Sequence, residues 1–540
     1  MKTRTIIVFY LILVLIGIAL TGFPQGIVND GGYITGSSSS YVKVSGSGDA
    51  WLINGNADQV SFGNLIVDFT GSGLYSLSVS DTSYITVTGN LTLNDTLRLK
   101  ADSTSMASLI TNGSVIGTKA VVEQYIKDDQ WHMVSPPVAS AVSGVYTGSY
   151  LAKWNEPDST WTYVSSTTDP LAAGHGYFVW ASSSLGSPEH VEFTGQLNTG
   201  NMAVSGMTYN PGSGKGDGWN LLGNPYPCAL EWTSSWTTSG IDATIYIYDG
   251  VQYKTWNYNL GGYGTLGNGY IPSTQGFWVK ANSSSPSLTI PASERTHQSQ
   301  QFYKAGENTE AEMLTVTLTG NGMDDKLVVG WIDSATDGFD HEFDAYKLDG
   351  IEQAPSIRTL ANGEELSVSL IAPPKNKTKW VEVVVSIPEG GMYKLDFGDL
   401  ETVDHSVNIY LWDKVAPNPE TKWVDMRKLG VYKFEAEPGE NQHRFRIFFE
   451  PKNDGNSITV SQGDQIAGAE VWTTGHSLFV HNKDLTGADV EVYSLLGQKV
   501  FSARVNPESL EEFMINVKKG YYIVKLHSSH SLLTHKVFFN

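Results

Sequence analysis

The sequence predicts an all-β protein of several domains, built of β-sandwich or jelly-roll-like modules. Its 540 residues exceed what one hydrophobic core usually organises. Apolar residues make up 40% of the chain and charged residues 17%, with many Gly and Tyr, which suits strands and tight turns. Short runs of alternating polarity recur about every ten residues, and helix-period segments are absent.

Residues 1–23 have the pattern of a secretory signal peptide. Lys2 and Arg4 precede an unbroken apolar run, followed by a polar stretch with Gly and Pro. The alternative is an uncleaved membrane anchor, since no clean small-x-small cleavage site follows, although the run is shorter than the ~20 residues of a membrane span. Cys228 is the only cysteine, which rules out a lipobox cysteine and an internal disulfide framework.

The charge balance argues against nucleic acid as a partner. The formal net charge is −21, and removal of Lys2 and Arg4 with the signal would make it more negative. Such a surface repels phosphate backbones.

The region 24–128 is predicted as an N-terminal β-rich domain. Runs such as NLIVDF, LYSLSV and YITVTGNLTL are separated by Gly, Asn, Asp and Ser. Their spacing fits either a β-sandwich or a short β-solenoid, and both readings stay open at this point.

Residues 129–300 contain an internal repeat, which predicts two β-units, 129–200 and 201–300. The motif DDQWHMVSPPV recurs as GDGWNLLGNPYP, placing Trp131 88 residues before Trp219. Each copy has an aromatic middle and closes alike, with GYFVWASSS in the first and GFWVKANSSS in the second.

Two further domains are predicted, at 301–452 and 453–540. Seven or more alternating runs, among them MLTVTLTG, WVEVVVSI and HRFRIFFE, indicate a β-sandwich in the first. The polar spacer PKNDGNS separates it from the second, which the residues alone describe as a small all-β domain.

Three segments of the last domain resemble a known family. They are VYSLLGQKV, KKGYYIVKL and the terminal HKVFF. Gly497 can supply the positive φ of the turn in the first segment. In order and position these segments resemble the type A C-terminal sorting domain of type IX secretion substrates of Gram-negative bacteria. The residues that carry the predicted sorting signal are Tyr493, Gly497, Lys499, Gly520, Tyr522, Val524, Lys536 and Val537.

The resemblance implies an Ig-like sandwich and a route of export. Such domains fold in the periplasm, bind the outer-membrane translocon and are commonly cleaved by a sortase-like surface protease. The cargo is then often attached to anionic lipopolysaccharide. The expected location is therefore the outer cell surface or the extracellular space. Upstream, WHMVSPPV and GWNLLGNPYP are similar to segments of uncharacterised surface proteins of the same class.

A search for catalytic motifs finds none. No G-x-S-x-G elbow, H-E-x-x-H helix or Walker loop is present. We therefore expect a non-enzymatic adhesive, structural or glycan-binding role. The alternative is a secreted hydrolase whose site is assembled from distant loops.

One dense acidic segment, DSATDGFDHEFDAYKLD, is a candidate calcium site. Its carboxylates at Asp337, Asp340 and Asp344 are the ligand type that Ca²⁺ prefers, but EF-hand spacing is absent. The competing explanation is that these side chains cap turns. We expect no other cofactor.

Aromatic residues in the middle of the two repeats suggest a glycan-stacking platform. Trp154, Trp161, Trp256 and Tyr258 supply flat apolar faces flanked by polar groups. Core packing is the alternative role for each, because Trp at strand spacing is commonly buried. A glycan or a surface protein is the expected external ligand.

Overall fold

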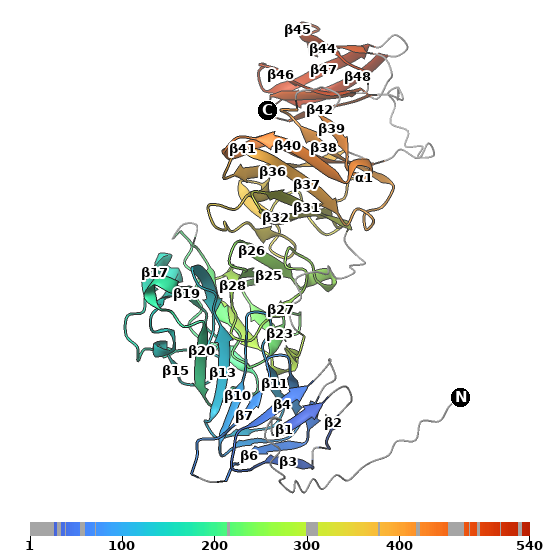
Figure 1. The fold of residues 1–540 in the computed structure, drawn as a ribbon. Helices are drawn as coiled ribbons and strands as arrows, with labels where there is room; N and C mark the ends of the chain where they lie inside the picture. Colours follow the sequence, from blue (N-terminus) through green and yellow to red (C-terminus); the bar gives the residue numbers. More distant parts are fainter. Residues whose placement is uncertain are drawn as a thin grey trace, which may run out of the picture. The chain divides into compact units, whose positions relative to one another are not determined.

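The computed structural model describes residues 26–539, apart from 30–33, 38, 55–59, 71, 213–215, 299–311, 376–377, 417–421, 452–468, 475, 483–486, 508 and 528–531. The predicted signal peptide lies outside these residues. The chain divides into two compact units. Figure 1 labels the main strands of both. The first comprises Met1–Gly240, Tyr270–Phe277 and Ala281–Gln300, and the second comprises Ile241–Gly269, Trp278–Lys280 and Gln301–Asn540.

The first unit begins with a parallel β-solenoid, so the solenoid reading of this region is the one that the structure adopts. Three parallel sheets follow the chain in turn, in the orders β1-β4-β7-β10-β13, β2-β5-β8-β11 and β3-β6-β9-β12. The strands are β1 (Gly26–Asn29), β2 (Ile34–Thr35), β3 (Tyr41–Val44), β4 (Ala50–Asn54), β5 (Val60–Phe62), β6 (Asn64–Val67), β7 (Ser76–Val79), β8 (Tyr84–Val87), β9 (Leu91–Leu93), β10 (Thr96–Leu99), β11 (Ser108–Thr111), β12 (Val115–Ile116) and β13 (Ala120–Tyr125). Their inward apolar side chains form one buried core.

One corner of the solenoid is fixed by stacked glycines and asparagines. A Cβ on Gly89 would lie 2.6 Å from the carbonyl oxygen of Gly63, so this corner accepts no larger residue. The side-chain oxygen of Asn64 accepts the N–H of Asn90, whose own Oδ1 accepts the N–H of Ser114. The dipeptide Gly-Asn at 63–64 and 89–90 therefore marks successive turns of the solenoid.

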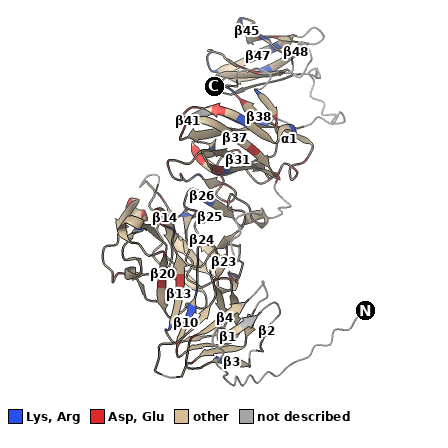
Figure 2. Ribbon diagram, viewed as in Figure 1, with Lys and Arg blue, Asp and Glu red and all other residues tan. Residues whose placement is uncertain are grey.

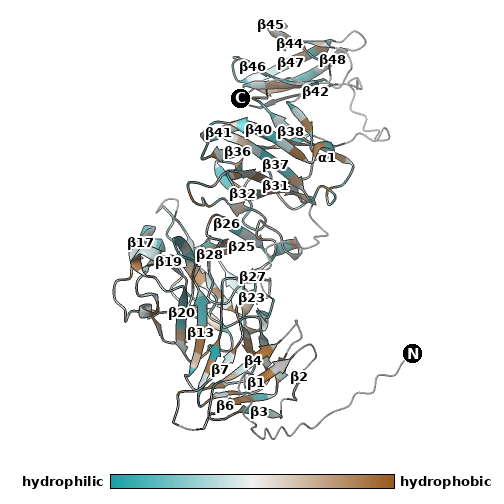
Figure 3. Ribbon diagram, viewed as in Figure 1, coloured by the Kyte–Doolittle hydropathy of each residue, from teal (hydrophilic) through white to brown (hydrophobic). Residues whose placement is uncertain are grey.

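An antiparallel strand adds to the edge of the solenoid sheet β1-β4-β7-β10-β13. Strand β20 (His190–Gly195) pairs with β13 along its whole length. Arg98 on β10 forms ion pairs with Glu123 on β13 and Glu192 on β20. Figure 2 shows the basic colour on β10 beside the acidic colour on β13 and β20. In Figure 3, hydrophobic and hydrophilic residues alternate along the same strands, as expected for a sheet with one buried face.

The two copies of the internal repeat place their motif strands alike. In the first copy the strands are β14 (Gln130–Val134), β15 (Ala141–Val142), β16 (Tyr150–Asn155), β17 (Thr160–Tyr163), β18 (Pro170–Leu171) and β19 (Tyr177–Ala181). In the second they are β22 (Trp219–Gly223), β23 (Ala229–Glu231), β25 (Ile241–Tyr248), β26 (Tyr253–Asn257), β27 (Tyr270–Ile271) and β28 (Gly276–Ala281). Hairpin β25–β26 corresponds to β16–β17, and the short ladder β23–β27 to β15–β18.

Additional strands complete this part of the chain. They are β21 (Met202–Val204), β24 (Thr237–Ser239), β29 (Ser287–Ile290) and β30 (Arg295–Thr296). Strand β29 lies between β21 and β24, and β30 pairs with β23.

The second unit contains a large sheet, which we call the passenger sheet (residues 312–451). Its strand order is β39-β38-β41-β36-β34-β35-β32-β31-β37-β40, with β33 paired to β35. The strands are β31 (Glu312–Gly320), β32 (Met323–Trp331), β33 (Ala345–Tyr346), β34 (Ser356–Ala361), β35 (Glu364–Ile371), β36 (Lys379–Ile387), β37 (Gly391–Gly398), β38 (Val407–Asp413), β39 (Trp423–Asp425), β40 (Val431–Ala436) and β41 (Gly439–Pro451), and the short helix α1 (Met426–Leu429) follows β39. Val316 on β31, Ile409 on β38 and Ile447 on β41 share one core, so this single hydrogen-bonded sheet curls until distant strands pack against one another.

The chain continues into a small antiparallel sandwich of two sheets. One sheet has the order β42-β43-β46 and the other β45-β44-β47-β48. The strands are β42 (Ala469–Thr474), β43 (Ser477–Asn482), β44 (Ala488–Ser494), β45 (Lys499–Val505), β46 (Ser509–Met514), β47 (Gly520–His527) and β48 (Leu532–Phe539). Leu478, Val490 and Val524, from both sheets, belong to one buried core. Among the described residues, no helix has the length and apolar character needed to cross a membrane.

Candidate functional site

One face of the sheet β14-β19-β16-β17 is covered with aromatic side chains. Trp180 pairs directly with Trp131 on one neighbour and with Tyr150 on the other, so the three side chains lie on the same face. Trp154 pairs with Trp161 in the same way, and period-two alternation places Phe178 and Tyr163 with them. We call this set the aromatic face: Trp131, Tyr150, Trp154, Trp161, Tyr163, Phe178 and Trp180.

The opposite face of the same sheet holds it in place. Leu151 and Val179, which alternate with residues of the aromatic face, are 4% and 0% exposed and belong to the core that continues from the solenoid. The aromatic face is therefore carried on a sheet whose other side is packed against the core at Leu151 and Val179. Burial of apolar area on that inner side stabilises the sheet without using the outer rings.

A continuous series of ring contacts joins five residues of the aromatic face, Trp154, Trp161, Phe178, Trp131 and Trp180, while the rings of Tyr150 and Tyr163 contact each other. The ring of Phe178 stacks between those of Trp131 and Trp161, with centroids 5.0 Å and 5.3 Å away. Trp131 also meets Trp180 edge to face at 5.5 Å. Edge-to-face and offset-stacked pairs of this kind fix ring orientation, which leaves flat surfaces in defined positions.

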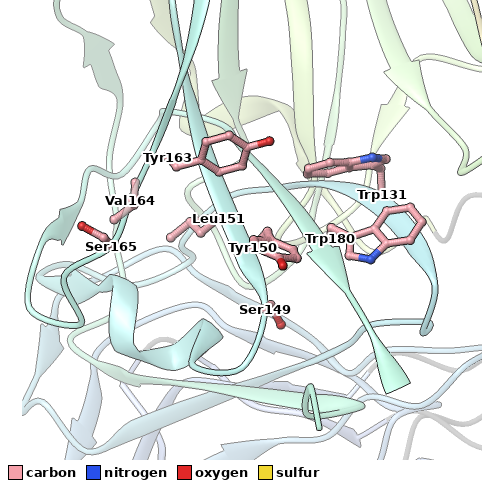
Figure 4. A pocket seen from close by; sticks show the side chains of 8 residues that line it. All are labelled: Trp131, Ser149, Tyr150, Leu151, Tyr163, Val164, Ser165 and Trp180. Atoms are coloured by element: carbon pink, nitrogen blue, oxygen red, sulfur yellow. The ribbon is translucent and has the colours of Figure 1, made fainter. Parts of the chain in front are cut away.

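One end of the aromatic face opens into a pocket of about 610 Å³. Its lining residues are Trp131, Ser149, Tyr150, Leu151, Tyr163, Val164, Ser165 and Trp180. Tyr150 and Tyr163 are 53% and 63% exposed. Figure 4 shows the rings of both tyrosines grouped with the indoles of Trp131 and Trp180. The volume lies in the range that holds small-molecule ligands.

The four aromatic residues of the pocket keep their polar atoms available. Among the described residues, the phenol groups of Tyr150 and Tyr163 and the indole N–H groups of Trp131 and Trp180 have no hydrogen-bond partner. The lining includes no Asp, Glu, Lys, Arg, His or Cys side chain. The pocket thus combines apolar ring faces with uncharged hydrogen-bond donors.

The four residues predicted for glycan stacking have different surroundings. Trp161 is 37% exposed on the aromatic face, and Trp154 lies beside it, half-buried, with its Nε1 donating to the carbonyl oxygen of Trp219 at 2.7 Å. Trp256 on β26 is 7% exposed, and Tyr258 follows it, half-buried. Trp154 and Trp161 belong to the first unit, whereas Trp256 and Tyr258 belong to the second.

Sequence reasoning missed the four aromatic residues that line the pocket. From the sequence, Trp131 and Trp180 belong to the repeat motifs only, and Tyr150 and Tyr163 are not singled out. A signal is present in GYFVWA, where Tyr177 and Val179 alternate with Phe178 and Trp180. When a strand is apolar on both faces, one face packs on the core, and the other must either be covered by another part of the chain or be exposed as a binding surface.

The three acidic residues of the candidate calcium site make local bonds. Asp337 pairs with Lys379, with Oδ2 2.6 Å from Nζ. Asp340 accepts the N–H of Thr336, and Asp344 accepts the N–H groups of Asp340 and Leu370. Burial raises the pKa of the Asp344 carboxyl to about 7. No group of three or more His, Cys, Asp and Glu side chains is arranged to hold a metal ion in the described part of the chain.

The predicted sorting-signal residues divide between two faces of the C-terminal sandwich. Val524 and Val537 are buried in its core, and Tyr522 packs against that core. Tyr493, Lys499 and Lys536 lie on the opposite face, where Lys536 Nζ is 4.2 Å from the ring centre of Tyr521.

The two predicted turn glycines differ in conformation. Gly497 has φ of +84°, as the turn requires. Gly520 opens β47 as an ordinary strand residue. Some residues of the predicted signal therefore determine the fold of the sandwich, and others lie on its surface.

Two family models match the chain. The model described as "Domain of unknown function (DUF8693)" matches residues 35–449, which is most of the chain. The chain belongs to this family. The model described as "Secretion system C-terminal sorting domain" matches residues 476–540. This match confirms that the protein is a type IX secretion substrate, and that it is secreted to the cell surface or the extracellular space. Its tail interacts with the secretion system.

Solved structures are only distantly similar to this chain. A dimeric latent PorU from Porphyromonas gingivalis matches at 10% identity over 47% of this chain and 31% of that chain, with a TM-score of 0.12. A biofilm-associated protein, BSP domain, matches at 8% identity over 78% of this chain and 92% of that chain, with a TM-score of 0.16. Both TM-scores are too low to support an argument about fold or function. No curated protein matches the chain.

Proposed function

We propose that this secreted protein is a non-enzymatic glycan-binding module, displayed on or released from the cell surface. The observation that carries the proposal is the pocket at the open end of the aromatic face. Two exposed tyrosines and two tryptophans there offer flat apolar surfaces with unused hydrogen-bond donors at their edges. A sugar ring has an apolar face and a polar rim, and this combination of groups complements both.

The ligand class follows from charge. A carboxylated or sulfated sugar would need a cation, and the pocket lining has none. The chain as a whole carries a net charge of −21, which further disfavours anionic ligands. Neutral glycans therefore fit the pocket best. Adhesion to glycan-coated surfaces would follow from display of this pocket outside the cell.

The rival function, a secreted hydrolase, finds no support at this pocket. The nearest carboxylates on the same hairpin have structural roles: Glu156 is 3% exposed and its Oε1 accepts the N–H groups of Asn210 and Gly218. Asp158 accepts the hydroxyl of Thr160. Binding without turnover is the expected behaviour.

Processing at the cell surface is part of the same proposal. Removal of the sorting domain by a sortase-like protease and attachment of the cargo to anionic lipopolysaccharide are supported by the sorting-domain match. Mass spectrometry of the secreted chain would show loss of the residues from about 455 onward if the tail is removed, and an intact C-terminus if it is not.

The binding proposal is tested with an array of neutral and acidic glycans. Wild type, the double variant Tyr150→Ala/Tyr163→Ala and the control Tyr41→Ala would be compared. Tyr41 is 69% exposed on the solenoid, so its loss removes an exposed tyrosine without touching the pocket. We expect neutral-glycan signals from wild type and Tyr41→Ala and their loss in the double variant.

Two results would overturn this function. One is identical array signals from all three proteins. The other is release of shortened sugars from the bound glycans, which would favour the hydrolase.

A further inference from the structure

Phe479 in the sorting domain points away from its own core, yet it is buried. Its neighbours Leu478 and Val480 are both 0% exposed and belong to the core between the two sheets of the sandwich. Because side chains alternate along a strand, Phe479 and His481 lie on the outer face of β43. An apolar side chain in that position is expected to face solvent, but Phe479 is only 1% exposed.

The cover over Phe479 comes from the passenger sheet. Phe479 forms one buried cluster with Trp412 on β38 and Phe448 on β41. Trp412 pairs with Arg446, and Phe448 pairs with Tyr410, so these residues share one face of the sheet. The partly buried rings of Trp380, Tyr410 and Trp423 pack against the cluster.

The other face of the same strands is already occupied. Leu411 and Ile447 are 0% exposed and belong to the passenger core. The face with Trp412 and Phe448 is therefore the outer face of a sheet that is packed on its inner side. Without a covering domain, this outer face would present a cluster of large aromatic rings to solvent, which soluble proteins rarely do outside binding surfaces.

Arg446 links the two domains at the centre of this contact. Its guanidinium carbon lies 5.1 Å from the ring centre of Phe479, 4.7 Å from that of Trp380 and 5.2 Å from that of Trp412. Its Nε and Nη1 atoms are buried and have no hydrogen-bond partner among the described residues. Ring faces of both domains thus surround the cation, and desolvation strengthens such an arrangement.

His481 makes a second contact on the same strand face. Its ring stacks on that of Trp423 at 5.6 Å, and its Nδ1 is 3.6 Å from Oε1 of Glu450. Glu450 is 4% exposed, so this carboxylate is covered as well. Phe479 and His481 therefore both find partners on the same face of the passenger sheet.

We infer that the outer face of β43 is a docking surface by which the sorting domain binds the passenger sheet of the same chain, with Phe479 inserted beside Arg446. The partner is the outer face of β36, β38, β39 and β41 of the same chain. Docking keeps this aromatic surface covered for as long as the sorting domain stays in place, and separation of the sorting domain exposes it. The inference does not depend on glycan binding, because its residues lie in a different unit from the pocket.

Oxidative footprinting of tryptophans in the full-length chain tests this inference. Trp412 is 4% exposed and Trp161 is 37% exposed, so Trp412 is expected to oxidise roughly ninefold more slowly in the wild type. In Phe479→Ala/His481→Ala, and separately in Arg446→Gln, its rate should rise severalfold while that of Trp161 stays constant. Phe538→Ala, on the other sheet of the sandwich, is the matched control and should change neither rate.

A further arm separates the domains without altering the interface. A specific protease site inserted after Gly455 allows the folded chain to be cut, and release of the sorting domain should raise Trp412 oxidation as the variants do. Hydrogen exchange of the β43 amides distinguishes a sorting domain that is undocked but folded from one that is unfolded. Arg446→Gln is a second control against unfolding, because it changes no residue of the sorting domain. Two results would overturn the inference: rapid oxidation of Trp412 in the wild type, or continued protection of Trp412 in Arg446→Gln and in the cut chain from which the sorting domain has been released.

Discussion

A half-buried histidine at the end of the first unit should make this part of the protein sensitive to acid. His297 follows β30 and joins two solenoid strands: its Nε2 is 2.9 Å from the Thr86 hydroxyl, and its Nδ1 is 2.7 Å from the Ser108 hydroxyl. Its ring stacks on that of Tyr84 at 5.8 Å. Burial lowers the pKa of His297 from 6.5 to about 4. The imidazole therefore stays neutral in the folded protein over a range in which the unfolded chain binds a proton.

The sign and the size of the effect follow from this lowered pKa. Between pH 6.5 and about 4 the unfolded state holds more protons at His297 than the folded state, so the stability of its attachment falls as pH falls. Above pH 6.5 His297 is neutral in both the folded and the unfolded state, so its attachment has its full stability. The difference between a pKa of 6.5 and one of about 4 corresponds to at most ~3 kcal/mol, and the partial exposure of the ring reduces this figure.

The assay is hydrogen exchange of the segment around His297 at pH 7.5 and pH 4.5, corrected for intrinsic exchange rates. The variant His297→Gln can bond both hydroxyls but does not titrate. We expect the opening free energy to fall by ~1–3 kcal/mol more in the wild type than in the variant. An equal fall in both proteins, or an NMR titration of His297 with a midpoint near 6.5, would refute the reasoning.

Two further predictions concern stability and export. Lys347 and Asp325 form an ion pair in which both side chains are almost fully buried, so Lys347→Met should cost ~3–5 kcal/mol in denaturant unfolding by leaving the carboxylate unpaired. The control Lys394→Met breaks an exposed pair and should cost less than ~1 kcal/mol. In the sorting domain, Val537→Ala should destabilise the sandwich by ~2 kcal/mol, whereas Lys536→Ala should leave its melting unchanged and lower the secreted fraction. Equal melting curves for the last two variants, or undiminished secretion of Lys536→Ala, would contradict the division into core and surface.

The fold could be predicted best for the internal repeat at residues 129–300, and less well for the strand order of the passenger sheet. Matching motifs at Trp131 and Trp219 indicated two related units, and both copies carry corresponding hairpins. The solenoid could have been distinguished from a sandwich by the recurring Gly-Asn at 63–64 and 89–90, whose stacking requires a parallel coil. The single curled sheet of the passenger has no such local mark, because strand order depends on pairings between distant segments.

For the candidate site, the sequence did not predict which aromatic side chains are exposed. Trp161 and Trp256 occupy matching positions in the repeat, yet one is 37% exposed and the other 7%. Their local sequences do not distinguish them, since exposure depends on what other segments pack against the outer side of each hairpin. The same holds for Phe479, whose alternation predicts an outward side chain but whose burial depends on a surface that includes Trp412, far earlier in the chain.

The most direct test of the glycan-binding account is the dissociation constant of the full-length protein for its best neutral oligosaccharide from the array. Wild type, Trp180→Ala and the control Leu74→Ala would be titrated by calorimetry; Leu74 is fully exposed on the solenoid. We predict saturable binding that is unchanged in Leu74→Ala and weakened ~10-fold in Trp180→Ala, the loss expected for one stacking ring of ~1.4 kcal/mol. Equal dissociation constants for wild type and Trp180→Ala would contradict the assignment of the aromatic face as the binding site.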